Sequence, residues 1–190
     1  MNGARVEAIV IGASAGAVQA LSRMLPALPG DFPVPILVVV HVPPGRSNAL
    51  VPLLDGRCAI AVKEAEDKEP IRPGVYFAPA DYHLLVERDR TLALSSDDLV
   101  LFSRPSVDVL FESAAEVYGE NLLGIVLTGA NDDGSAGLRA ICDAGGAALI
   151  EDPDRAYAAA MPSAALVACS GALTMPLESI AAYLVELADA

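Results

Sequence analysis

Three residues of this chain carry chemically reactive side chains at positions where strands are expected to end. Ser14 stands in the stretch GASAG (12–16), where a run of strand-forming residues gives way to a helical pattern. His41 directly follows the apolar run ILVVV (36–40), and Asp133 follows the apolar run LLGIVL (122–127). A hydroxyl, an imidazole and a carboxylate are the parts of a hydrolytic triad, in which the imidazole takes the hydroxyl proton and the carboxylate orients the imidazolium.

Each of these residues also has a structural alternative. A serine at the start of a helix more often caps it, and the same holds for an aspartate such as Asp133 that immediately precedes a helical pattern. His41 would alternatively be a core histidine satisfied by a backbone carbonyl. Catalysis is favoured because ligands of open parallel sheets bind outside the carboxyl ends of the strands, so the three side chains are expected on one rim.

The surroundings of Ser14 favour a nucleophile over a phosphate-binding turn. The glycines at 12 and 16 permit a sharp turn that exposes Oγ, and free N–H groups at the start of the next helix can face an oxyanion. The pattern G-x-S-x-G resembles a nucleophile elbow, but α/β-hydrolases place the aspartate before the histidine. A dinucleotide fingerprint is a weak alternative, because Val18 replaces the third glycine and His41 stands in place of an acidic residue.

The elements that must position these residues alternate between strand and helix. Buried strands are expected at 6–11, 36–40, 122–127 and 147–150, because their runs show no polar alternation. Helices are expected after the first strand with the stripe Val18, Leu21, Leu25 and Leu28, at 48–54, from Ser106 to Gly119, before Gly145–Gly146, and from Leu177 onward. Between them, PPGRS is expected to be a loop.

The middle of the chain has a different pattern. GVYFAP, HLLVER and TLALSS are closely spaced, so they predict an antiparallel hairpin or meander added to the main sheet, with His83 as a structural residue or part of a pocket rim. The predicted fold is therefore α/β, a doubly wound and mostly parallel sheet with helices on both faces and this small insertion. We expect one domain over residues 1–190.

Composition narrows the classes of function. The chain has 190 residues, 54% of them hydrophobic, and a net charge of −13, which disfavours nucleic acid and acidic membrane surfaces as partners. The three scattered cysteines predict buried thiols in a reducing cytoplasm, and two histidines exclude a histidine-rich metal site. Glu7 and several polar residues interrupt the N-terminal apolar run, so we expect a cytoplasmic protein without a signal or membrane span, metal or cofactor.

Six ordered motifs give the chain a family resemblance. They are IGASAG (11–16), HVPP (41–44), VYFAPADYHLLV (75–86), RPSVDVLFESAA (104–115), LTGANDDGSAG (127–137) and MPSAA (161–165). The chain resembles the catalytic domain of the CheB protein-glutamate methylesterases of chemotaxis. The resemblance implies that Ser14 is the nucleophile, His41 the general base and acid, and Asp133 the third member. It also implies an oxyanion site of backbone amides near the serine and in the LTG loop, at Ala15, Gly16 and Ala130.

The resemblance further implies a substrate and a partner. The family hydrolyses glutamate γ-methyl esters on the cytoplasmic helical bundle of chemoreceptors, and some members deamidate glutamine. Three departures bear on this chain. We expect no receiver domain before the first strand, and therefore control by a separate receiver protein or none at all. In NDD (131–133), Asp132 competes with Asp133 for the third role. The stretch EDPDRAYAAAMP (151–162) differs from the usual segment, which leaves substrate preference open.

Two other functions remain open at this point. A domain separated from its receiver can serve as a non-catalytic signalling scaffold, although such a module need not keep all three reactive residues. An esterase for another protein or for a small-molecule ester would use the same chemistry. A small ester favours a closed pocket, whereas a receptor helix needs an open groove.

Overall fold

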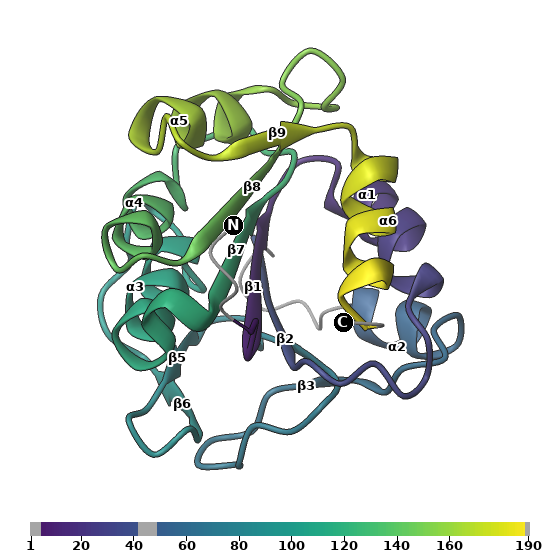
Figure 1. Cartoon of the computed structure of the whole chain (residues 1–190). Coiled ribbons are helices and arrows are strands. Elements are labelled where there is room, and N and C mark those ends of the chain that lie inside the picture. The colour runs from purple at the N-terminus through teal and green to yellow at the C-terminus, as the bar shows by residue number, and fades with distance from the viewer. Residues whose placement is uncertain (1–4, 42–48, 189–190) are drawn as a thin grey trace.

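A central parallel sheet separates two layers of helices (Figure 1). The computed structural model describes residues 5–41 and 49–188. The sheet has seven strands in the order β3-β4-β2-β1-β7-β8-β9, and every neighbouring pair is parallel. These strands are β1 (Ala8–Ala13), β2 (Ile36–Val40), β3 (Val62–Glu64), β4 (Val75–Phe77), β7 (Leu122–Val126), β8 (Ala147–Glu151) and β9 (Leu173–Met175).

Helices cover both faces of the sheet, and with them the expected doubly wound fold is confirmed. One face carries α1 (Ala17–Met24), η1 (Leu25–Ala27), α2 (Leu50–Asp55) and α6 (Leu177–Ala188) (Figure 1). The opposite face carries α3 (Val107–Tyr118), α4 (Ser135–Asp143) and α5 (Ala160–Ala168), with the one-turn η2 (Gly119–Asn121) following α3. In β1, Ile9 and Ile11 enter the first core and Ala8 and Val10 the second, because successive side chains of a strand point to opposite faces.

The expected antiparallel insertion is confirmed as a hairpin, but it contains only two of the three predicted segments. β5 (His83–Val86) and β6 (Leu92–Ser95) form a separate antiparallel hairpin that lies on the α3 side. GVYFAP does not join it: its strand β4 pairs in parallel with β2 and β3 inside the main sheet. The prediction for GVYFAP was wrong because close spacing in the sequence indicates hairpins. β4 instead lies between β2 and the short strand β3, which we did not predict, and it pairs in parallel with both.

Several boundaries also differ from expectation. β1 begins at Ala8 and extends to Ala13, so the strand ends directly at Ser14. Val18 is 48% exposed and does not belong to the buried stripe of α1, which consists of Ala17, Ala20, Leu21 and Met24. The strands β3 and β9 and the helix α5 were not predicted. The expected loop at PPGRS and Asn48, the first residue of the expected helix 48–54, lie outside the described residues.

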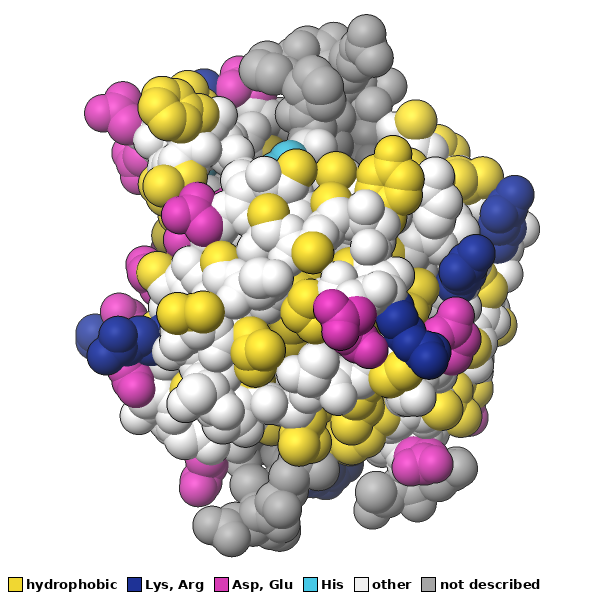
Figure 2. Space-filling view, turned by 90° about the horizontal axis from the view of Figure 1, so that it is seen from above, with side chains coloured by type: hydrophobic (Ala, Val, Ile, Leu, Met, Phe, Trp, Pro, Cys, Tyr) yellow, Lys and Arg dark blue, Asp and Glu magenta, His cyan; other side chains and the backbone are white. Residues whose placement is uncertain are grey.

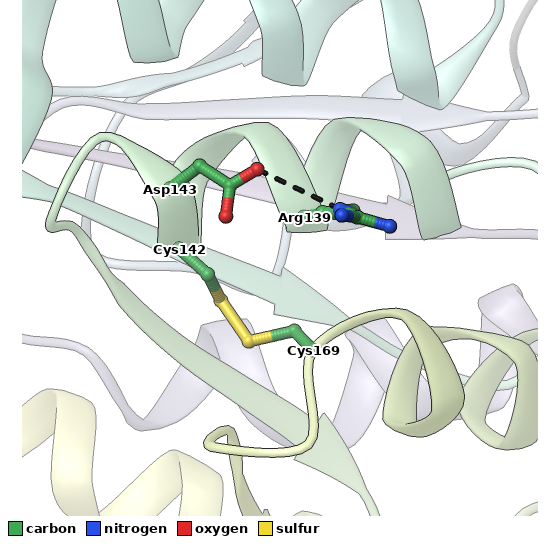
Figure 3. The surroundings of a disulfide bond; sticks show 4 residues. All are labelled: Arg139, Cys142, Asp143 and Cys169. Carbon is green, nitrogen blue, oxygen red and sulfur yellow. Dashed lines mark ion pairs between the residues drawn. A yellow bond between two sulfur atoms is a disulfide. The ribbon is translucent and has the colours of Figure 1, made fainter.

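The prediction of three free thiols is wrong. Cys142 at the end of α4 and Cys169 after α5 form a disulfide, with their Cα atoms 6.5 Å apart, and Cys58 alone is free (Figure 3). Scattered spacing does not exclude a disulfide, because the packing of α5 beside α4 brings together two residues that are 27 positions apart.

Close contact between α3 and α4 depends on Gly137. A Cβ atom at this position would lie 2.5 Å from Cβ of Phe111, which is closer than real Cβ atoms approach, and 3.0 Å from backbone atoms of Asp108, which is tighter than most real contacts. A side chain here therefore forces the two helices apart.

We expect Gly137→Ala to lower the free energy of unfolding by about 1–3 kcal/mol, the usual cost of overpacking. Gly171→Ala is the matched control, since nothing lies within 4 Å of the added Cβ. Urea denaturation of both variants measures the effect. Equal stabilities would contradict the tight α3–α4 contact.

Candidate active site

Ser14 follows β1 directly and precedes helix α1. Its backbone N–H donates to the carbonyl of Thr128 (2.9 Å), and its carbonyl accepts from Ala17 N–H (2.9 Å). No side chain caps the N-terminus of α1, where Gly16 adopts φ +88°. The hydroxyl instead lies 3.1 Å from Nδ1 of His41, so the capping interpretation of Ser14 is wrong.

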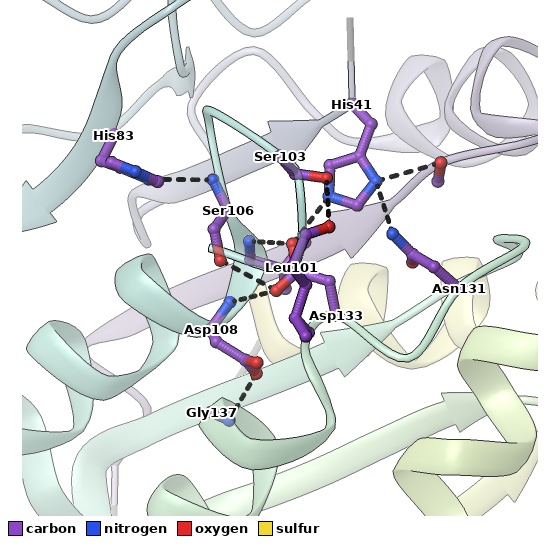
Figure 4. A network of polar contacts seen from close by, with 11 residues as sticks. His41, His83, Leu101, Ser103, Ser106, Asp108, Asn131, Asp133 and Gly137 are labelled. Atoms are coloured by element: carbon purple, nitrogen blue, oxygen red, sulfur yellow. Dashed lines mark hydrogen bonds and ion pairs between the residues drawn. The ribbon is translucent and has the colours of Figure 1, made fainter. Parts of the chain in front are cut away.

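His41 lies between the hydroxyl and a carboxylate. It follows β2, which neighbours β1, and its backbone N–H donates to the carbonyl of Ala13 (3.4 Å). Nδ1 faces Ser14 Oγ at 3.1 Å, and Nε2 is 2.7 Å from Oδ2 of Asp133 (Figure 4). The side chain is 14% exposed, so the ring is largely sheltered but reachable from the surface. The sheet order β2-β1-β7 thus brings the three predicted residues together.

The carboxylate of Asp133 is buried at the N-terminus of α3. Besides His41, its oxygens accept hydrogen bonds from Val107 N–H (2.8 Å), Asp108 N–H (3.0 Å) and Ser106 Oγ (2.8 Å). Burial alone would raise the pKa of Asp133, but the hydrogen bonds from His41 and from the backbone of Asp108 and Val107 outweigh it and lower the pKa. Asp133 is therefore ionised at neutral pH, as a group that orients an imidazole must be.

The negative charge of Asp133 determines which ring nitrogen of His41 carries a proton. A carboxylate is only an acceptor, so Nε2 carries the proton in this contact. The unprotonated Nδ1 then has its lone pair free to accept the hydroxyl proton of Ser14. The arrangement can remove a proton from Ser14 while the imidazolium that forms is stabilised by Asp133.

Asp132 does not compete for this position. Its side chain is exposed, and its carbonyl accepts from Ser135 N–H (3.2 Å) at the start of α4. His83 is a structural residue, as expected: its ring is buried, Nε2 donates to the carbonyl of Asp98 (3.0 Å), and Nδ1 accepts from Ser106 N–H (3.1 Å). His83 thereby holds the residue whose hydroxyl contacts Asp133.

Thr128 joins the turn after β1 to the loop after β7. Its N–H donates to Oε2 of the buried Glu151 (2.8 Å), and its hydroxyl donates to the carbonyl of Ala15 (2.7 Å) and accepts from Ala158 N–H (2.8 Å). Burial raises the pKa of Glu151, partly offset by this bond from Thr128. Within residues 5–41 and 49–188, the N–H groups of Ala15, Gly16 and Ala130 donate to no protein acceptor, so they remain available.

Four supporting residues were not predicted, namely Ser106, Asp108, Thr128 and Glu151. Ser106 was expected to begin a helix. This helical pattern was the signal in the sequence that could have indicated a helix N-terminus near the site. The described part of the chain contains no group of three or more His, Cys, Asp or Glu side chains able to hold a metal ion. No helix in these residues is long and apolar enough to cross a membrane.

Exposed apolar side chains lie on loops near the site. Phe102, four residues before Ser106, is 97% exposed, and Tyr157, beside Gly16, is 79% exposed. Leu101 and Phe102 adopt φ of 47° and 62°, which bulky residues rarely do. The turn is held by paired backbone bonds between Val100 and Ser103 (3.1 and 2.8 Å). In Figure 2 a histidine reaches a surface on which hydrophobic side chains are spread between acidic and basic groups.

Asp108 and Asp133 cap each other's helices. Asp133 precedes α4 and accepts from the first residues of α3, while Asp108, in the first turn of α3, accepts from Gly137 N–H in α4 (2.7 Å). Burial, together with the charge of Asp133, raises the pKa of Asp108 to about 6, although the bond from Gly137 opposes the shift. The folded protein thus holds this proton more tightly than the unfolded chain does.

This shift predicts a pH dependence of stability. Since the folded pKa of Asp108 lies above its ordinary value of 3.8, ionisation costs stability as pH rises from about 4 to about 6. Asp108→Asn keeps an acceptor for Gly137 but has no proton to lose. As the pH rises from about 4.5 to about 7, we expect the Tm of the variant to increase by a few degrees relative to that of the wild type.

The control is Asp143→Asn, whose carboxylate is 72% exposed and pairs with Arg139 at 3.6 Å. Thermal unfolding of all three proteins should show a pH-dependent difference for Asp108→Asn alone. A Tm difference between Asp108→Asn and the wild type that stays constant with pH would contradict a raised pKa of the buried Asp108.

Comparison with known proteins agrees with this geometry. The family model of the CheB methylesterase matches residues 9–184. A putative protein-glutamate methylesterase/protein-glutamine glutaminase of Leptospira interrogans is 47% identical over 182 residues, which cover 95% of this chain and 94% of that protein. A protein of the same activity from Myxococcus xanthus is 43% identical over 180 residues, but this chain spans only 52% of its length. The crystal structure of the Thermotoga maritima CheB methylesterase catalytic domain superimposes with a TM-score of 0.90 at 35% identity, covering 96% of this chain and 98% of that one.

Proposed function

This chain belongs to the CheB methylesterase family, and we propose that it is a serine hydrolase that removes methyl groups from glutamate γ-methyl esters of chemoreceptors. We assign Ser14 as the nucleophile, His41 as the general base and acid, and Asp133 as the residue that orients His41. The observation that supports these roles best is the position of His41, with one ring nitrogen on Ser14 Oγ and the other on the buried carboxylate.

The mechanism follows from the protons of His41. Ser14 Oγ attacks the ester carbonyl carbon as its proton passes to Nδ1, and the tetrahedral oxyanion is held by N–H groups of Ala15, Gly16 and Ala130. The C–OCH₃ bond then breaks, and the methoxy oxygen takes the proton from Nδ1 and leaves as methanol. Water attacks the carbonyl carbon of the glutamyl-serine ester and gives one proton to Nδ1. The C–Oγ bond then breaks as Ser14 regains that proton, and the glutamic acid that departs loses its remaining proton to solvent. One oxyanion donor contributes about 3 kcal/mol to such a step.

The same steps apply to an amide. The relatives' names include protein-glutamine glutaminase. We extend the proposal to glutamine side chains, where ammonia replaces methanol as the leaving group and takes its proton from the same nitrogen. No new residue is needed.

A protein substrate suits a site in which Ser14 and His41 are partly exposed. A groove of about 850 Å³ lies between β5 and α3, lined by Leu85, Arg88, Glu112 and Glu116 among others, and a cavity of about 290 Å³ lies beside the disulfide. Neither is lined by Ser14, His41 or Asp133. Ser14 and His41 are partly exposed, so a side chain presented on a protein surface can reach them, whereas a small ester is held better by an enclosing pocket.

We expect Ser14→Ala to reduce methanol release from methylated receptor fragments more than about a thousandfold. The Tm should stay within about two degrees of the wild type, since the only hydrogen bond of this hydroxyl within the described residues is to the ring of His41 and a typical hydrogen bond contributes about 1 kcal/mol. A serine-directed fluorophosphonate should label the wild type at Ser14 and leave the variant unlabelled. Labelling of another serine, or full activity of the variant, would overturn the assignment.

The exposed Phe102 provides a test of the protein substrate. We expect Phe102→Ala to raise KM for methylated receptor fragments about fivefold or more, as loss of an aromatic anchor costs at least ~1 kcal/mol. Val167→Ala is the control, because Val167 is 85% exposed but lies near Cys169, at the opposite end of α5 from Met161, whose N–H contacts the Gly129 loop. Equal KM values for wild type and Phe102→Ala would argue that the tip of this loop does not touch the substrate.

A further inference from the structure

The side-chain amide of Asn131 lies against the catalytic nitrogen of His41. Asn131 is in the loop between β7 and α4, two residues before Asp133, and its Nδ2 is 3.4 Å from Nδ1 of His41 (Figure 4). Nδ1 is also the atom that faces Ser14 Oγ, at 3.1 Å. Two donors, the hydroxyl of Ser14 and the amide of Asn131, therefore share a single lone pair on Nδ1.

The other end of the amide has no partner. Oδ1 of Asn131 is buried and accepts no hydrogen bond within the described residues. A buried carbonyl without a donor costs free energy, so a buried unpaired oxygen beside a reacting nitrogen requires an explanation. The resting state gives none, because Nδ1 then carries no proton for Oδ1 to accept.

Proton transfer changes this balance. Once Nδ1 has taken the proton of Ser14, it becomes a donor, and the amide nitrogen of Asn131 is no longer a suitable neighbour. Rotation of the amide about its last side-chain torsion exchanges Oδ1 and Nδ2, and this torsion has a broad energy profile. Oδ1 then accepts from the Nδ1–H of a charged ring, a bond roughly twice as strong as its neutral counterpart.

We propose that Asn131 is a positioning residue that accepts a hydrogen bond from Nδ1–H of the His41 imidazolium and steadies it until the leaving group takes the proton. This inference rests on the proposed function, because it assumes that His41 takes the proton of Ser14. It adds a second acceptor to the imidazolium, so that Asp133 holds Nε2–H and Asn131 holds Nδ1–H.

The titratable groups near His41 do not contact the ring nitrogen that Asn131 contacts. Asp133 contacts Nε2, and Asp108 lies behind Asp133 on α3, where both accept backbone N–H groups. Glu151, on the β8 side, contacts Thr128, and His83, on the β5 side, contacts Ser106. None of these contacts involves Nδ1 of His41, so a change confined to Asn131 reports on that nitrogen.

The test is the pH profile of fluorophosphonate labelling at Ser14, which does not depend on the natural ester. Labelling needs an unprotonated Nδ1, so its acid limb reports protonation of His41. In Asn131→Leu, which keeps the size but loses the acceptor, we expect the midpoint of this limb to fall by about half a pH unit or more. In the double variant Asn131→Asp/Asp132→Asn, which keeps the net charge, we expect it to rise by about one unit.

Asp132→Asn alone is the matched control, because it removes the neighbouring exposed charge without touching His41. Turnover of methylated receptor by Asn131→Leu should also fall about fivefold in kcat, with KM within about twofold of the wild type. An acid limb in Asn131→Leu that is unchanged or moves to higher pH would overturn the inference, since the amide would then be inert or act as a donor to the neutral ring. Failure of the wild type to be labelled at Ser14 would instead overturn the proposed function, and this inference with it.

Discussion

The carboxylate of Asp133 is the group on which the geometry of the site depends. A buried charge is costly unless hydrogen bonds replace its water, and here four groups do so: the ring of His41, two backbone N–H groups of α3 and the hydroxyl of Ser106. The positive end of the α3 dipole adds to this stabilisation. One side chain therefore fixes the start of a helix and the orientation of the imidazole at once, and the imidazole in turn faces Ser14.

The surrounding contacts repeat this use of buried carboxylates. Asp108, on α3, caps the start of α4. Glu151 accepts from the N–H of Thr128, and Thr128 in turn connects the turn after β1 to the loop after β7. Both carboxylates have a raised pKa, because burial is incompletely offset at their positions, whereas Asp133 has a lowered one. The direction of the pKa shift therefore differs between the two carboxylates that hold the framework and the one that contacts His41. The framework leaves the N–H groups of Ala15, Gly16 and Ala130 free of protein acceptors in the described residues, which is what an oxyanion site requires.

Much of this could be predicted from the sequence, because parallel sheets place their strand ends on one rim. The unalternating apolar runs predicted β1, β2, β7 and β8, and reading the polar residues after three of them singled out Ser14, His41 and Asp133. The sequence could not show that Ser106 and Asp108 hold Asp133, since no spacing links residues 106 and 133. Short strands such as β3 and β9 have too few residues for a periodic pattern, so the parallel pairing of β4 was mistaken for a meander. The disulfide between Cys142 and Cys169 depends on helix packing and has no local pattern.

The central claim is that Asp133 holds a proton on Nε2 of His41 and thereby leaves Nδ1 free to take the proton of Ser14. Nitrogen NMR of the His41 ring in the resting enzyme near neutral pH tests it directly, because protonated and unprotonated ring nitrogens resonate far apart. The account predicts a protonated Nε2 and an unprotonated Nδ1. A proton found on Nδ1 and none on Nε2 would contradict it, since the nitrogen that faces the hydroxyl would then have no lone pair to offer.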